Sequence, residues 1–430
     1  MKVQASLTKS VLAFISTNLI FFGANAADSE LSCLASPSDI VAATGKVLPK
    51  CAPKATPDFR SHLDPVSAVF VICSGPTKHS CLNILEGIAL AKTGAKVNVL
   101  LVEALLNDAK FSSRLSAIST KASAGQLNVI PVAPTALQFL RDPFFMESQN
   151  GVPAYHNFPN PMVPKSSSII DQAMQACGIQ KADGDFENPN PVSASLIKRH
   201  FSESEAAQAD QNASMGGNVL ALPNGTLAIG HIDRAGKTHP EFINYLANRA
   251  KLLEVEIPAL RVGHIDEIFN IAPNPQVKAG QCPFILLRAS PKKMQAFLKK
   301  QNQLPPEVEQ AIDSGRYTDD AADAQEIIDR STKSLLAELS TTYKNCVPPV
   351  IDVPVLFSEG YAILPNPVNG LHVNGAYFLS AQKFPAIEKE IANTLKPYFP
   401  KGVQFIDTTQ YDASLGNIHC ATQNISVDCQ

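Results

Sequence analysis

Short apolar runs that favour β-strands alternate along this chain with stretches of helical spacing, and this alternation constrains the fold more than any other feature. Ser67–Cys73 and Lys96–Glu103 are rich in β-branched residues, and Leu82–Gly94 between them has helical spacing and ends on a glycine. The 32 prolines and 22 glycines argue for many turns and against a helical bundle. The repeating unit resembles strand–strand–helix–strand, and we predict a mixed α/β fold.

The same alternation resumes after residue 218. Val219–Leu222 and Thr226–Ile229 flank Pro223-Asn224-Gly225, which is a hairpin signal. Residues 143–215 are polar and rich in proline and asparagine, so we expect a loop-rich segment there. Further strands are predicted at Leu127–Val132, Pro283–Ala289, Val350–Phe357, Tyr361–Leu364, Ala376–Leu379 and Gly402–Asp407. Further helices are predicted at Pro240–Lys251, 292–302, 320–345 and Phe384–Tyr398, with an acidic loop between the second and the third.

Residues 1–26 have the pattern of a secretory signal peptide. Lys2 and Lys9 precede the apolar run Val11–Ala24, and Ala24-Asn25-Ala26 fits an A-x-A cleavage site. The alternative is a membrane anchor, but this run is shorter than the about 20 residues that a bilayer span needs. We therefore predict a secreted or periplasmic protein with no membrane span after cleavage. An irregular N-terminal arm is expected over 27–65, and one domain over 66–430.

The nine cysteines are an odd number for an exported chain, so at least one is expected outside a disulfide. Cys33 and Cys51, and likewise Cys73 and Cys81, are close enough in sequence to suggest local bridges, although spacing alone leaves the connectivity open. The chain has no C-x2-C pair, which argues against a zinc site. A formal net charge of −3 provides no basic field that would hold nucleic acid.

Four short segments contain the residue types that attack on a guanidinium carbon requires: Phe139–Asp142, Gly216–Asn218, Gly263–Glu267 and Gly416–Gln423. The carboxylates of Asp142 and Asp266 suit the planar fork of N–H donors on a guanidinium. Cys420, as a thiolate, would add to its carbon. His264 would protonate the departing amine and then activate water. Ammonia leaves, and a thiouronium intermediate is hydrolysed to a ureido product.

The order of these segments, FLRD, GGN, VGHIDE and GNIHCATQ, resembles the guanidine-modifying superfamily with the five-bladed α/β propeller (pentein) fold. Val262–Pro273, Pro283–Pro291 and Phe405–Cys420 are most similar to the catalytic domain of protein-arginine deiminases. The resemblance implies a pentein catalytic domain over 66–430, built from repeated ββαβ-like units, that converts arginine in peptides or proteins to citrulline. The motif IHCATQ also resembles agmatine deiminases, so a deiminase of agmatine or free arginine is the alternative.

Carried over by position, the resemblance implies that Cys420 is the nucleophile and His264 the general acid and base. It implies that Asp142 and Asp266 are the two carboxylates that bind the guanidinium. Phe139 lies where the deiminases place a tryptophan against the aliphatic stem of the substrate. The predicted substrate-binding residues are Phe139, Gly217, Asn218 and His419.

The chemical step is expected to need no organic cofactor and no metal. The calcium-dependent deiminases have oxygen-bearing side chains around the first catalytic aspartate. The corresponding positions here are Arg141, Pro143 and Phe145, which offer no side-chain oxygen to a cation. We therefore expect no calcium activation through these positions.

Other interpretations stay open at this point. A cysteine near the C-terminus is more often half of a disulfide than a nucleophile. A chain that retains the pocket could also bind guanidines without catalysis. Amidino transfer would require an amine acceptor in place of water, and no motif for one is visible.

Overall fold

The computed structural model describes residues 33–44, 58–59, 63–123, 125–135, 137–141, 144–149, 152–157, 166–182, 216–231, 246–277, 282–314, 316–343, 347–413 and 416–426. Within these residues, five sheets share one plan. Each contains an antiparallel strand pair, and one strand of that pair is joined in parallel by a strand that follows it in the chain. Such a parallel connection needs a crossover segment, usually a helix.

The sheet nearest the N-terminus shows why the sequence folds this way. Strands β2 (Val66–Cys73), β3 (Lys96–Val102) and β4 (Leu127–Val132) are parallel, with helices α3 (Lys78–Leu90) and α4 (Ala109–Lys121) as crossovers. All eight residues of β2 are buried, as expected for a parallel strand that is covered on both faces. The last strand, β19 (Thr422–Ser426), pairs antiparallel with β2, so the end of the described chain returns to its first long strand.

The other four sheets repeat the plan. Their strands are β8 (Val219–Ala221), β9 (Leu227–His231) and β10 (Leu252–Glu256); β11 (Phe269–Pro273), β12 (Phe284–Ser290) and β13 (Val350–Pro354); β16 (Leu371–Val373), β17 (Ala376–Ser380) and β18 (Val403–Ile406); and β1 (Asp58–Phe59), β5 (Phe144–Gln149), β6 (Val152–Asn157) and β7 (Gln180–Lys181). In three of these sheets the crossover helices are α9 (Pro291–Leu298), α10 (Pro306–Asp313) and α11 (Arg316–Thr342) between β12 and β13, α12 (Pro385–Leu395) between β17 and β18, and α5 (Ser166–Ala176) between β6 and β7.

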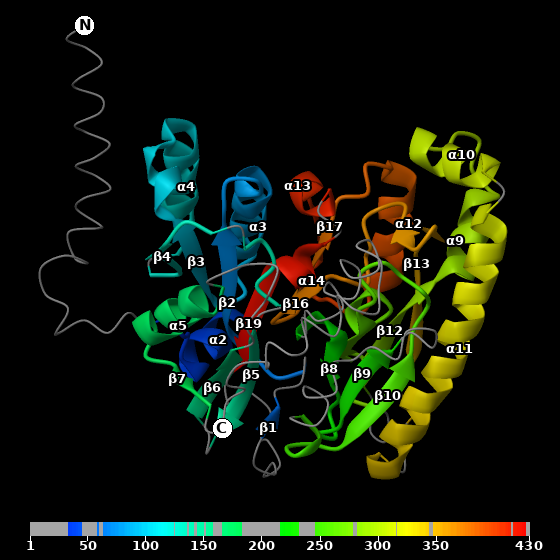
Figure 1. Cartoon of the computed structure of the whole chain (residues 1–430), viewed down its shortest axis with the longest axis horizontal. Coiled ribbons are helices and arrows are strands. Elements are labelled where there is room, and N and C mark those ends of the chain that lie inside the picture. Colours follow the sequence, from blue (N-terminus) through cyan, green and yellow to red (C-terminus); the bar gives the residue numbers. More distant parts are fainter. Residues whose placement is uncertain are drawn as a thin grey trace, which may run out of the picture.

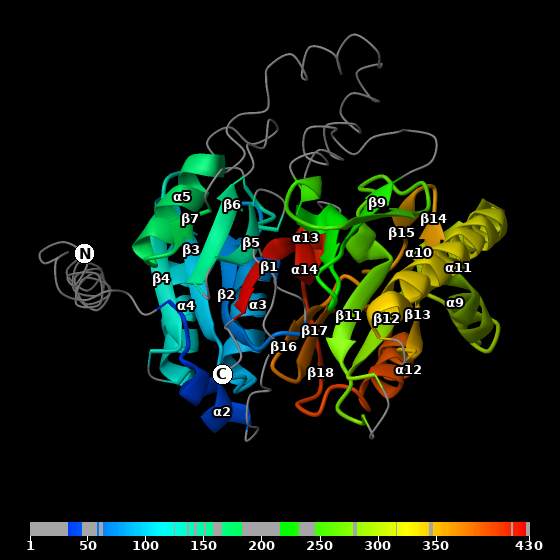
Figure 2. The same ribbon diagram turned by 90° about the horizontal axis from the view of Figure 1, so that it is seen from below.

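The remaining elements are short. They are α2 (Pro37–Thr44), α13 (Thr409–Asp412), α14 (Ile418–Ala421), the hairpin of β14 (Phe357–Ser358) and β15 (Tyr361–Ala362), and the 3-10 turns η2 (Glu103–Asn107), η3 (Gly216–Asn218) and η4 (Ile265–Glu267). Figures 1 and 2 place α14 in the middle of the molecule, between the β2–β4 sheet and the β11–β13 sheet. The long helix α11 lies at the opposite end of the molecule from α3 and α4 (Figure 1).

The predicted mixed α/β class and its strand–strand–helix–strand unit are confirmed by these pairings. The predicted strand Leu127–Val132 has the bounds of β4, and the predicted hairpin around Pro223-Asn224-Gly225 joins β8 to β9. Closure of the sheets into a five-bladed propeller stays a prediction.

The expectation of a loop-rich segment over 143–215 is wrong for part of that range, because β5, β6, α5 and β7 lie there. Some of the polar residues described in this range are buried and hydrogen-bonded between these elements. Asn157 in β6 donates through Nδ2 to Asp171 Oδ1 at 2.8 Å, and Tyr155 donates its hydroxyl to the same oxygen.

Helix α2 lies within the arm over 27–65 that was expected to be irregular, and α10 lies within the predicted acidic loop, so both descriptions are wrong at those residues. The predicted helix Pro240–Lys251 lies largely outside the described residues, as does the predicted signal peptide. Among the helices that the structure describes, none has the length and apolar character needed to cross a bilayer.

The predicted Cys73–Cys81 bridge is confirmed, and the predicted Cys33–Cys51 bridge is wrong, because Cys33 is bonded to Cys177. The backbone N–H of Ala35 donates to Ser67 O at 3.2 Å, and the Ser67 hydroxyl donates to Ala35 O at 2.7 Å. These bonds hold the N-terminal segment alongside β2, where Cys33 meets the residue that follows α5. Cys282 also takes part in a disulfide.

Two large hydrophobic clusters support the centre of the molecule. One is formed mainly by the sheets β8–β10 and β11–β13 and by helices α9, α11 and α12. The other is formed by β2, β3, α3 and α4 together with residues 371–421. The 3-10 turn η4 belongs to the first cluster through Ile265, and α14 belongs to the second through Ile418 and Ala421.

The two described bridges should differ in their effect on stability. Cys33 and Cys177 are separated by 144 residues, and Cys73 and Cys81 by 8. In the chain-entropy view, the first bridge constrains the unfolded chain by about 5 kcal/mol and the second by about 2.5 kcal/mol. We expect Cys33→Ala/Cys177→Ala to lower the free energy of unfolding by more than Cys73→Ala/Cys81→Ala, as measured by urea denaturation. Equal losses would contradict this explanation.

Candidate active site

Cys420 lies in the short helix α14 and is 5% exposed. It is present as a thiol and not as half of a disulfide. Its backbone is fixed on both sides: the Cys420 N–H donates to Asn369 Oδ1 at 3.3 Å, and the Cys420 carbonyl accepts from the Arg141 N–H at 3.2 Å. The sulfur is therefore held at one buried position.

Asp266 reaches the same position from the turn η4. Its carboxylate is 2% exposed, and its Oδ2 lies 2.7 Å from His419 Nδ1 and 3.8 Å from the sulfur of Cys420. In the part of the chain that the structure describes, Asp266 Oδ1 is buried without a hydrogen-bond partner. A buried carboxylate oxygen without a partner destabilises the folded chain unless a hydrogen-bond donor binds it. A cationic N–H donor from a ligand would suit it.

The turn that carries Asp266 is anchored by Asn218. The side chain of Asn218 accepts from the Ile265 N–H at 3.1 Å and donates to Gly230 O at 2.8 Å. A Cβ at Gly230 would come within 2.5 Å of Asn218 Oδ1, so the glycine permits this close approach. Gly217 is buried beside Asn218 in η3. Gly217 and Asn218, which were predicted to bind substrate, thus support the turn that carries Asp266. Their contact with substrate stays a prediction.

The charges around Asp266 act on its pKa in opposite directions. Burial raises the pKa of this carboxyl to about 6, while nearby positive charge on His264 and Arg141 opposes the rise. Burial also holds the pKa of His419 well below its usual value, and Arg141 and His264 lower it further. A neutral His419 imidazole that carries its proton on Nδ1 donates to the Asp266 carboxylate.

His264 precedes Asp266 by two residues and is 1% exposed. Its backbone N–H donates to Glu267 Oε2 at 3.1 Å. Burial, together with the neighbouring negative charge of Asp266, raises the pKa of Glu267 to about 8 despite this hydrogen bond. Glu267 is therefore protonated at neutral pH, and Asp266 is the carboxyl of this turn that ionises there.

Arg141 joins the first predicted motif to α14. Its guanidinium is buried and donates through Nε to His419 O at 3.0 Å and through Nη2 to Asn424 Oδ1 at 2.9 Å. Its charge favours the ionised form of Asp266 and the neutral form of His419. Arg141 thus serves as a fixed cation beside the site. Asp142, the adjacent predicted carboxylate, lies outside the described residues.

Phe139 packs next to the segment that leads into α14. Its ring centroid lies 5.8 Å from that of Tyr411, and a Cβ at Gly416 would overlap the Phe139 ring. The glycine is therefore required for this packing. Phe139 is half-buried, so part of its surface remains available. Its predicted contact with the substrate stem stays a prediction.

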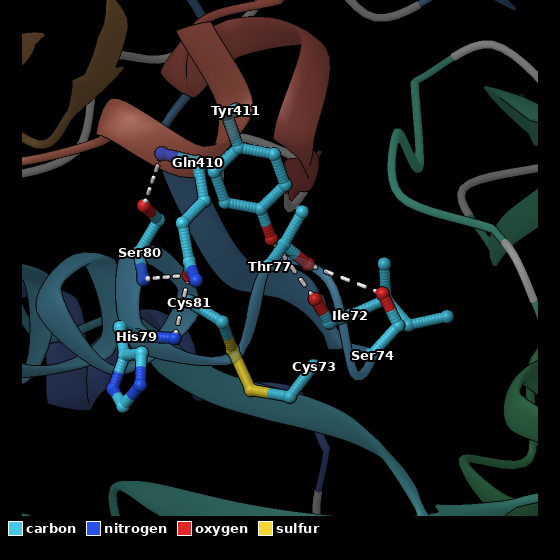
Figure 3. The surroundings of a disulfide bond; sticks show 9 residues. All are labelled: Ile72, Cys73, Ser74, Thr77, His79, Ser80, Cys81, Gln410 and Tyr411. Atoms are coloured by element: carbon cyan, nitrogen blue, oxygen red, sulfur yellow. Dashed lines mark hydrogen bonds between the residues drawn. A yellow bond between two sulfur atoms is a disulfide. The ribbon is translucent and has the colours of Figure 1, made fainter. Parts of the chain in front are cut away.

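A network around the Cys73–Cys81 disulfide fixes α13, which precedes this segment (Figure 3). Gln410 Oε1 accepts from the backbone N–H groups of His79 and Ser80 at 2.8 and 3.0 Å. The Tyr411 hydroxyl donates to the carbonyl of Ile72 at 3.0 Å. The disulfide closes the turn between β2 and α3, and α13 is hydrogen-bonded to that turn. The disulfide therefore helps to fix α13, which precedes the segment that carries Cys420.

Sequence reasoning missed Asn369. This residue is 1% exposed in the turn Pro365–Gly370, and its Nδ2 lies 3.2 Å from the sulfur of Cys420. The turn contains two prolines, two asparagines and a glycine, a composition that indicates a loop and nothing more specific. Its contact with Cys420 spans 51 residues of sequence and becomes visible only in the folded chain.

No cluster of metal-ligating side chains occurs among the residues described in the structure. The side chains gathered around Cys420 are instead an imidazole, a carboxylate, a guanidinium and an amide. Such a set can bind a flat cation next to a sulfur nucleophile.

The raised pKa of Asp266 predicts that ionisation of this carboxyl lowers the free energy of unfolding. Its pKa is about 6 in the folded chain against an ordinary value of 3.8. The stability associated with its protonation is complete below the lower value and is lost as the pH rises through the higher one. As the pH rises from 4 to 7.5, we expect the free energy of unfolding of Asp266→Asn to increase relative to that of the wild type, by roughly 1–3 kcal/mol.

Urea denaturation at the two pH values measures this gain. Asp352→Asn is the matched control, because it removes one carboxylate from the 42% exposed Asp352 side chain on β13. A pH-independent difference between Asp266→Asn and the wild type would contradict the prediction.

Comparison with solved structures identifies the fold. An agmatine deiminase from C. jejuni matches with a TM-score of 0.52 at 12% identity, covering 86% of this chain and 96% of that chain. An agmatine deiminase of Enterococcus faecalis matches with a TM-score of 0.53 at 12% identity, covering 88% and 100%. A Porphyromonas gingivalis protein provisionally named an arginine deiminase matches with a TM-score of 0.52 at 14% identity, covering 86% and 98%.

No protein-family model and no curated protein matches the sequence. The similarity to solved structures, all at low identity, concerns the fold. The chain shares the mixed α/β fold of these solved deiminase structures.

Proposed function

We propose that this protein hydrolyses the guanidine group of its substrate to a ureido group and ammonia. The observation that carries the proposal is the buried Asp266 carboxylate, whose Oδ1 has no hydrogen-bond partner among the described residues and whose Oδ2 lies only 3.8 Å from the Cys420 sulfur. A guanidinium that donates to this carboxylate would bring its central carbon next to the thiol. Asp142 is the proposed second carboxylate, on the basis of the sequence resemblance.

The proposed reaction has two stages. The Cys420 thiolate attacks the guanidinium carbon, a C–S bond forms, and His264 gives a proton to one nitrogen, which leaves as ammonia. Water then gives a proton to His264 and adds its oxygen to the same carbon. The C–S bond breaks, its electron pair returns to sulfur, the remaining hydroxyl proton passes to solvent, and the ureido product is released.

The two histidines are proposed to have different roles. His419 donates from Nδ1 to Asp266, and its lowered pKa keeps the ring neutral, so at neutral pH it has no second proton to give to the leaving nitrogen. It therefore orients the carboxylate. His264 is near enough to Asp266 and His419 to influence the pKa of both, and it is the proposed general acid and base.

A small guanidine, agmatine or free arginine, is the preferred substrate class, because the solved structures with this fold include agmatine deiminases. Arginine within a peptide or protein is the second candidate. It is favoured by the segments VGHIDEIFNIAP and FIDTTQYDASLGNIHC, which resemble protein-arginine deiminases. We further propose export to an oxidising compartment, supported by the signal-peptide pattern and by the disulfides.

Cys420→Ala should abolish turnover, by at least about 10³-fold, because no other described group could form the covalent intermediate. Release of ammonia and formation of the ureido product are measured with agmatine, free arginine and an arginine peptide. Cys33→Ala/Cys177→Ala is the control, since it removes two cysteines and should keep activity below its own unfolding temperature. Turnover by folded Cys420→Ala would end the proposal, and the preferred substrate decides between the two classes.

Activity should be the same in excess EGTA as with added calcium. The structural reason is that the Arg141 guanidinium, bound to the His419 carbonyl and to Asn424, provides a positive charge beside the site. Phe145 is buried in a hydrophobic cluster with β8 and β9 and has no oxygen to offer. Steady-state rates with each additive test this, and an absolute calcium requirement would refute it.

A further inference from the structure

We propose that Asn369 is a catalytic residue that donates a hydrogen bond to the sulfur of Cys420 and stabilises its thiolate. The inference rests on the proposed function for its biological meaning, since it concerns the nucleophile of that reaction. It assigns a role to a residue outside all four motifs.

The geometry of the amide fixes which of its atoms faces the sulfur. Oδ1 of Asn369 accepts from the backbone N–H of Cys420 at 3.3 Å, so the other end of the amide, Nδ2, points to the sulfur at 3.2 Å. The carbonyl oxygen of Asn369 accepts from the His419 N–H at 3.2 Å. Three contacts from one residue thus set the backbone of α14 and the environment of the sulfur together.

The turn that carries Asn369 is held rigidly from the other side. Asn270 Nδ2 donates to the carbonyls of Val368 and Gly370 at 3.1 and 3.0 Å, and these carbonyls flank Asn369. A Cβ at Gly370 would come within 2.6 Å of the ring of Tyr377, so the turn packs directly on β17. Asn369 is therefore fixed before any substrate binds.

Electrostatics explains why the sulfur needs such a donor. Cys420 is buried, and burial disfavours a thiolate. The Asp266 carboxylate, 3.8 Å away, disfavours it further when ionised. An amide N–H stabilises a negative sulfur without titrating, so it acts over the whole pH range and does not exchange protons with His264 or His419.

The test is the pH dependence of Cys420 alkylation by iodoacetamide, which reports the thiolate and needs no guanidine substrate. Labelling of Cys420→Ala gives the background from other cysteines. The wild-type midpoint is the reference for the variants. In Asn369→Ala and Asn369→Asp we expect a higher midpoint and about a tenfold lower alkylation rate at pH 7. The aspartate variant keeps an oxygen for the Cys420 N–H but replaces the donor with a carboxyl group that carries charge when ionised, so Asn369→Ala is the variant that removes the donor without adding charge.

Asn366→Ala is the matched control within the same turn. Asn366 donates to Glu267 O at 2.7 Å and accepts from the Val368 N–H at 3.0 Å, without a contact to the sulfur. Its alkylation midpoint should match the wild type. Folded Asn369 variants with unchanged midpoints would overturn the inference. If the midpoints shift but no guanidine is hydrolysed by the wild type, the proposed function fails and the role of Asn369 on the thiolate stands.

Discussion

The burial of the Asp266 carboxylate against Cys420 and His419 is the interaction on which the proposed site depends. A carboxylate removed from water is destabilised, and here one of its oxygens has no hydrogen-bond partner among the described residues. The fold keeps the group in place through the backbone, because Asn218 and Gly230 prevent η4 from turning outward. A cationic substrate that donates a hydrogen bond to this oxygen would recover the free energy lost by burial. The bond would favour the one substrate orientation that allows it.

The position of the site follows from the way two hydrophobic clusters meet. Asp266 belongs to a turn that packs on one cluster, and Cys420 to a short helix that packs on the other. The turn Pro365–Gly370 lies between them, touching Glu267 through Asn366 and Cys420 through Asn369. A change that shifts one cluster relative to the other would therefore alter the distance between carboxylate and sulfur without affecting either cluster internally.

The sequence allowed the elements with strong local signals to be predicted. Strand β4, the β8–β9 hairpin and the Cys73–Cys81 bridge depend on neighbouring residues, and all three were predicted. Motif order also indicated Asp266 and Cys420, which the fold brings to 3.8 Å. Asn369 and the Cys33–Cys177 bridge depend on contacts across 51 and 144 residues, for which the local pattern carries no signal. The β5–β6 hairpin was missed because its polar side chains find buried partners on α5.

Stability and activity oppose each other at this site, and the position of the Cys73–Cys81 disulfide bears on that opposition. Burial raises the pKa of Asp266, so the folded chain disfavours the negative charge that would bind a guanidinium. A site that is destabilised in this way needs support from groups that do not enter the chemistry. The disulfide closes the turn that binds Gln410 and Tyr411, and Tyr411 in turn packs against Phe139 beside Gly416. The Cys73–Cys81 disulfide thus restrains α13 and, through Tyr411, Phe139. It does so without a contact to the Cys420 sulfur or the Asp266 carboxylate.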